Sequence, residues 1–295
     1  MCHLRAKLVV KSSPTEIVKR RVHIDFDSAP ATNWFPREPV TETFLNAVSF
    51  FLPAGEKFFI ESVQHYKHRI AGPVLQDQVQ RFVYQEAMHT REHINCNHML
   101  SKTFRYGPKI EKIGEFFLNL ARWFTPKAFQ LAVTCAIEHY TAVLADNLLR
   151  NQARVIHNAD PEFAKFWIWH AVEETEHKAV CLDVYQEVVG KGPFAYLLRV
   201  VAMLVTTMFL AGAVAIAVAL IRRGQPSVQV PTKKSTERQV TILELVKTLV
   251  PWQLYFDYFR PSFHPWDHQN AHLIEEWKKR FPDFGIASHR PASNV

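Results

Sequence analysis

Two pairs of residues in this chain have the spacing of metal ligands on a helix. Glu86 and His89 form one Glu-x-x-His pair, and Glu174 and His177 form a second. Residues three apart share one face of an α-helix, so the carboxylate and the imidazole of each pair point the same way. Carboxylate and imidazole groups together bind iron, manganese and zinc. The two pairs therefore indicate a metal site between two helices.

A further glutamate lies on the helix that precedes each pair, Glu61 before the first and Glu138 before the second. If each helix and its successor form an antiparallel hairpin with the glutamates level, the turns fall between residues 73 and 74 and at residue 156. Both places are rich in turn residues, "AGPVL" and "RNQARVIHNADP". One Glu from each of two helices and one Glu-x-x-His from each of the other two is the ligand set of a di-metal carboxylate bundle.

Two neighbouring residues bear on this set. Glu56 competes with Glu61, but its level partner would be Arg91, so we predict Glu61 as the ligand. His170 precedes Glu174 by four residues, and at about 100° per residue it falls within a stripe about 60° wide with Glu174 and His177. The predicted metal ligands are therefore Glu61, Glu86, His89, Glu138, His170, Glu174 and His177.

The alternative is a chance pattern on helix surfaces. A single Glu-x-x-His is common, but two of them, each after a helix with a level glutamate, are far less expected by chance. Burying four carboxylates without cations is very costly. The donor set suits iron or manganese better than structural zinc, which favours thiolates. We therefore predict two iron ions, with manganese or zinc as alternatives.

The rest of the chain predicts helices to position these residues. Only nine glycines occur, and there is no long alternation of polar and apolar β-branched residues. Asp160 and Pro161 form a helix start, as cap and first helical residue. The predicted fold class is all-α, a ferritin-like four-helix bundle with an extra long apolar helix and a C-terminal helical segment. Helices are expected at 40–52, 53–70, 74–104, 126–151 and 159–190.

Residues 200–221 are 22 residues without a charge, between Arg199 and the pair Arg222 and Arg223. At about 1.5 Å per residue they match the hydrocarbon thickness of a bilayer, although a buried helix of a large bundle has the same composition. We expect a cytoplasmic protein attached to or spanning the inner membrane through this segment. The predicted divisions are an irregular segment 1–39, the bundle 40–194, the apolar helix 195–223, a linker 224–240 and a helical segment 241–295.

Two families carry related patterns. The ligand arrangement from Glu61 to His177 resembles the seven-ligand di-iron site of the p-aminobenzoate N-oxygenase group, in which His170 would match the extra histidine. The whole chain, including "WFPREP", "FHPWD" and the apolar helix, looks more like a bacterial family catalogued as "predicted metal-dependent hydrolase". These resemblances imply a di-metal bundle without fixing its reaction.

Two reactions fit such a centre. The first is activation of O2 to oxygenate or hydroxylate a hydrophobic small molecule or lipid, which needs an electron donor. The alternative is a metal-dependent hydrolase, with Glu173 or His93 as a proton shuttle, whereas Glu176 should face solvent. A non-catalytic iron-binding protein is a third interpretation. The net charge of +7 is scattered and forms no basic stripe, so we expect no nucleic-acid partner.

Overall fold

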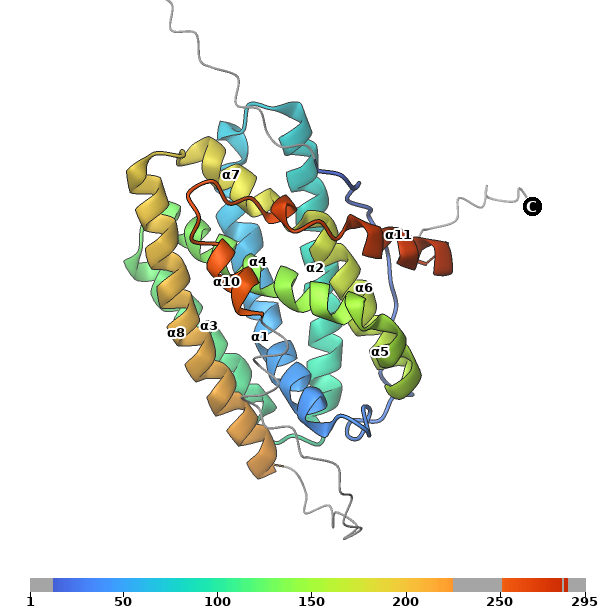
Figure 1. The fold of residues 1–295 in the computed structure, drawn as a ribbon. Helices are drawn as coiled ribbons and strands as arrows, with labels where there is room; N and C mark the ends of the chain where they lie inside the picture. Colours follow the sequence, from blue (N-terminus) through green and yellow to red (C-terminus); the bar gives the residue numbers. More distant parts are fainter. Residues whose placement is uncertain (1–12, 225–250, 283, 286–295) are drawn as a thin grey trace, which may run out of the picture.

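The computed structural model describes residues 13–224, 251–282 and 284–285. Four long helices make its centre, and α1 with α2 and α4 with α6 form two hairpins (Figure 1). The described residues contain no strand, which confirms the all-α prediction. The helices are α1 (Pro39–Gln64), α2 (Pro73–Ser101), α3 (Gly107–Phe124), α4 (Lys127–Arg150), α5 (Gln152–Asn158), α6 (Pro161–His177), α7 (Val180–Val188), α8 (Pro193–Gly224), α10 (Trp252–Asp257) and α11 (Ala271–Arg280).

The first helix runs through Pro53, where the sequence predicts a break between two helices. A proline inside a helix removes one N–H donor, so the carbonyl four residues earlier loses its partner. That carbonyl belongs to Ser49, and it accepts a 3.0 Å hydrogen bond from the Asn97 side chain of α2. The separate helices predicted at 40–52 and 53–70 are therefore wrong, because a neighbouring helix supplies the missing donor.

Three other elements differ from the prediction. The helix expected at 159–190 is two helices, α6 and α7, separated at Lys178 and Ala179. The turn expected near residue 156 contains the short helix α5, and α3 was not predicted. The Asp160 side chain caps α6 by accepting from the backbone N–H groups of Glu162 and Phe163, as predicted.

Two apolar clusters lie at opposite ends of the four central helices, with a polar layer between them. Along α1, Phe50 belongs to one cluster and Phe58 to the other, with Glu56 between them. Along α2, Phe82 and Cys96 belong to opposite clusters and enclose residues 86–93. The four helices therefore bring buried polar side chains together at one level inside an otherwise apolar core.

Helix α8 lies on the outside of this bundle, against α1, α3 and α4 (Figure 1). By length and composition α4 and α8 could each cross a membrane. The most apolar window of α4 is 61% buried inside the protein, whereas that of α8 is only 28% buried. Helix α4 is thus a core helix, and α8 is covered on one face alone. Of the linker predicted at 224–240, residues 225–240 lie outside the described residues.

Candidate metal centre

Six of the seven predicted ligands meet in the polar layer between the two hairpins. They are joined by Glu56 from α1, which the sequence analysis had set aside. All seven residues are at most 5% exposed, so they are shielded from solvent by the bundle. The members are Glu56 from α1, Glu86 and His89 from α2, Glu138 from α4, and His170, Glu174 and His177 from α6.

Their donor atoms form two adjoining groups, each with atoms within 4.8 Å of one another. One group is Glu86, Glu138 and His177, and the other is His89, His170 and Glu174. Glu174 faces both, because its Oε2 lies 3.5 Å from His177 Nε2 and its Oε1 lies 3.1 Å from His170 Nε2. The arrangement thus offers two metal positions with a carboxylate between them.

Glu86 also faces both groups. Its Oε1 lies 3.0 Å from His177 Nε2 and 3.8 Å from His89 Nδ1. It forms a further compact group with Glu56 and His89. Two glutamates from different hairpins, Glu86 and Glu174, therefore face both donor groups and would hold metal ions there.

Glu61 does not join this cluster, which corrects the sequence prediction. Its side chain is 58% exposed and accepts a 2.7 Å hydrogen bond from Arg122 of α3. Glu56 and Glu61 are five residues apart, about 140° around a helix, so only one of them can face inward. Equal height along two antiparallel helices does not fix the direction in which a side chain points, and a side chain reaches about one turn along the helix axis. Glu56 therefore reaches ligands on either side of Arg91.

Two of the histidines are held by partners outside the cluster. His89 Nε2 lies 3.1 Å from Glu173 Oε2, and His177 Nδ1 lies 2.8 Å from Gln85 Oε1. Because both partner oxygens are acceptors, these ring nitrogens carry the protons. The opposite nitrogens, His89 Nδ1 and His177 Nε2, face the carboxylates and would be the nitrogens that bind metal. Metal-ligating histidines are oriented in this way.

A chain of hydrogen bonds orients the third histidine. Ser49 Oγ donates to Asn97 Oδ1 at 2.7 Å, so it accepts from His93 Nδ1 at 2.8 Å. His93 Nε2 then accepts from His170 Nδ1 at 3.1 Å. The lone pair of His170 Nε2 is left to face Glu174. His93, which the sequence suggested as a proton shuttle, thus stands behind His170.

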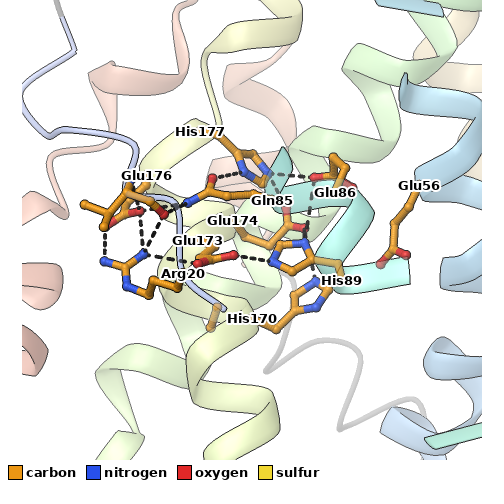
Figure 2. Close-up of polar contacts among 12 residues, drawn as sticks. Arg20, Glu56, Gln85, Glu86, His89, His170, Glu173, Glu174, Glu176 and His177 are labelled. Atoms are coloured by element: carbon orange, nitrogen blue, oxygen red, sulfur yellow. Dashed lines mark hydrogen bonds and ion pairs between the residues drawn. The ribbon is translucent and has the colours of Figure 1, made fainter. Parts of the chain in front are cut away.

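An ion network formed by Arg20, Glu173 and Glu176 supports the other side of the centre. Arg20 Nη1 lies 3.2 Å from Glu173, and Arg20 Nη2 lies 2.7 Å from Glu176. Figure 2 shows His89 with Glu173 and Arg20 on one side and Glu56 on the other. Glu173 is engaged by both Arg20 and His89, so it positions His89 instead of carrying protons freely.

Glu176, predicted to face solvent, is only 1% exposed. Its Oε2 accepts from Arg20, from the Gln85 side chain and from the backbone N–H of Val18. The segment before α1 is therefore tied to α6 by buried polar contacts. Arg20 belongs to the basic run "KRR" at 19–21, and no local spacing relates this run to α6.

The cluster is chemically incomplete without cations. Both carboxylate oxygens of Glu56, Glu86 and Glu138 are buried without a hydrogen-bond partner, as are His89 Nδ1 and His177 Nε2. Burial, and then the neighbouring Glu86, raise the pKa of Glu56 well above its ordinary value. Burial, with Glu174 and Glu86, does the same to the pKa of Glu138. Two cations would supply the missing charge and contacts, so the residues fit a metal pair.

A small cavity adjoins Glu138. A cavity of about 10 Å³ is lined by Glu138, Cys181 and Tyr258, among others. A larger groove of about 370 Å³, lined by Lys191, Arg199 and His264 among others, shares Leu182 and Phe263 with it. Leu182 and Phe263 therefore form a wall between the groove and the metal side of the bundle.

Comparison with known proteins gives one match. A family model described as "Predicted metal-dependent hydrolase" matches residues 18–269, which is most of the chain. No curated protein and no solved structure matches significantly. The matched region contains the whole cluster and its supporting residues.

Proposed function

The chain belongs to the family of predicted metal-dependent hydrolases, and we propose that its buried glutamate–histidine centre binds two metal ions and catalyses a hydrolysis. The observation that carries this proposal is the set of buried donor atoms without protein partners, drawn from four helices to one place. The hydrolytic reaction is the alternative of the sequence analysis, and the family description favours it over O2 chemistry.

A metal pair would lower the pKa of a water molecule and polarise an ester or phosphoester. The protein's part is to fix the geometry. Glu86 and Glu174 would hold the ions, while Glu173 and Gln85 fix the rings of His89 and His177. The groove beyond Phe263, with Lys191, Arg199, Asp183 and Asp267 on its lining, suits a polar substrate. Movement of Phe263 would admit it toward Glu138.

Activation of O2 at iron is the second candidate, and the surroundings of the histidines favour it. The Phe82 ring lies 5.0 Å from His177, and the Trp169 ring lies 5.0 Å from His89. Such aromatic walls exclude water, which protects oxidising chemistry. A carboxylate-rich donor set also suits iron. This candidate would additionally require an electron donor and a hydrophobic substrate.

Anaerobic assays separate the two candidates. Protein loaded with zinc, manganese or iron(II) is tested without O2 on chromogenic esters and phosphoesters, and O2 consumption is then followed for the iron form. We expect hydrolysis without O2, reduced at least about a thousandfold in Glu174→Ala, because a metal pair contributes several kcal/mol to the transition state. Glu61→Ala, outside the cluster, should retain the activity. O2 uptake by the iron form with no hydrolysis under any metal would replace the first candidate by the second.

A further inference from the structure

Exposed apolar side chains are concentrated on one side of the molecule. Of the fourteen large apolar side chains that are exposed among the described residues, twelve lie on α3, α8 and α10. We call these twelve the apolar face; Trp123, Leu204, Met208 and Trp252 are among them. The other two, Val74 and Ile94, lie on α2. An apolar patch of this extent marks an interaction site.

The three helices of the apolar face adjoin one another. The rings of Phe117 on α3 and Phe209 on α8 are 5.0 Å apart, and the Cβ position of Gly224 meets Tyr106 just before α3. Helices α3 and α8 therefore run antiparallel. On the other side, Tyr255 of α10 lies within 3.2 Å of Thr207 of α8. The exposed apolar side chains of α3, α8 and α10 thus form a single continuous surface along α8.

Basic residues gather at one end of the apolar face. Exposed Arg222 and Arg223 lie at the end of α8. Beside them lie exposed Arg105, just before α3, and exposed Lys109 and Lys112 in its first turns. Glu115 is the exposed acidic side chain of α3. At the other end of α3, Trp123 and Phe124 are 67% and 77% exposed. Aromatic and basic side chains beside an apolar surface are typical of a membrane interface.

We propose that the apolar face is seated in one leaflet of a membrane that contains anionic lipids, with α8 parallel to the bilayer plane. This proposal does not depend on the proposed reaction. The exposed side chains of α8 enter the acyl region, while the cationic end contacts lipid phosphates. The opposite side of α8 stays packed on the bundle through Ala202, Thr206 and Ala213.

If α8 crossed the bilayer, charged side chains of the neighbouring helices α1 and α3 would lie in its hydrocarbon core. Gly114 of α3 meets Phe51 of α1, and Arg122 of α3 bonds to Glu61 of α1, so this part of α1 lies level with the middle of α3. Exposed Lys57 and Glu61 on α1, with Lys112 and Glu115 on α3, would then cross the bilayer beside residues 200–221. Charged side chains at that depth are strongly unfavourable. If α8 lies parallel to the bilayer plane, these charged side chains stay outside the hydrocarbon, because only the exposed apolar side chains of the apolar face are immersed.

Vesicle binding tests the proposal on the full chain. The probe is flotation with vesicles of phosphatidylcholine containing about a third phosphatidylglycerol, compared with phosphatidylcholine alone. We expect binding that is stronger to the anionic vesicles and that falls at least about tenfold in the Leu204→Glu, Met208→Glu double variant. Replacing both Arg222 and Arg223 by glutamine should weaken vesicle binding by a similar factor, because each positive charge next to the membrane contributes about 1 kcal/mol. Val74→Glu, an equally exposed change on α2, should bind like the wild type.

Orientation is tested by impermeant thiol labelling on sealed membranes. The three cysteines that the structure describes are buried, so in a Cys2→Ser background Lys191→Cys and Arg223→Cys report on the two ends of α8. An in-plane helix predicts that both positions react from the same side. Reaction of one end alone would overturn the in-plane orientation. A failure to bind vesicles, with dimers that dissociate in the Leu204→Glu, Met208→Glu variant, would overturn the membrane proposal and make the apolar face a contact between copies.

Discussion

Replacing Glu56 by glutamine is expected to leave the metal-free protein as stable as the wild type and to remove a large part of its stabilisation by metal. Neither oxygen of Glu56 has a hydrogen-bond partner, so a neutral side chain of the same shape loses no contact. A metal at a hundred times its Kd stabilises the folded state by about 2.7 kcal/mol per site. In a chain of this size that corresponds to a Tm rise of roughly 5 °C. Thermal unfolding of both proteins, with and without added metal, measures the difference.

Glu61→Gln is the matched control for this experiment. Its side chain is exposed and ion-paired with Arg122, so the variant should show the same metal-induced Tm rise as the wild type. An equal metal response in all three proteins would show that Glu56 is simply a buried glutamate. A loss of the response in Glu61→Gln alone would restore the ligand predicted from the sequence.

Replacing Arg20 by leucine should lower the free energy of unfolding by about 3–5 kcal/mol. The substitution leaves the buried carboxylates of Glu173 and Glu176 without their main counter-charge. Denaturant unfolding measures the loss. Arg81→Leu is the control, because Arg81 pairs with exposed Asp77 and Glu16 at the surface and should cost at most about 1 kcal/mol.

A second substitution identifies the cause of that loss. Combining Arg20→Leu with Glu176→Gln removes one uncompensated charge, so the double variant should be more stable than Arg20→Leu alone. If Arg20→Leu is no more damaging than Arg81→Leu, the buried ion network does not hold the segment before α1 to α6. If the double variant is less stable than both single variants, lost packing and not lost charge accounts for the effect.

Local spacing predicted most of the cluster because its ligands lie in pairs on single helices. Glu86 with His89, and His170 with Glu174 and His177, are fixed by the helical period alone, and the cap at Asp160 is equally local. The choice between Glu56 and Glu61 was not local. Both residues lie on the helix predicted at 53–70, and which of them faces inward depends on how α1 packs against its neighbours, as in the contact of Glu61 with Arg122 of α3.

The supporting residues could not be predicted in the same way. Arg20 meets Glu173 and Glu176 across more than 150 residues of sequence, and no periodicity relates them. The sequence suggests His93 as a proton shuttle, but its role depends on Ser49 and Asn97, which settle which ring nitrogen carries the proton. Helix α3 did leave a signal, because apolar residues 110, 113, 116, 117, 120 and 124 follow helical spacing between two prolines.

The most direct test of the metal centre is the metal content of the purified full chain. Mass spectrometry after anaerobic loading with iron(II), manganese or zinc should give two metal ions per wild-type chain. Glu174→Ala, which removes the carboxylate between the two positions, should lose both, while Glu61→Ala should keep both. Wild-type protein that binds no stoichiometric metal under any of these conditions would contradict the account, and the buried glutamates and histidines would then need another explanation.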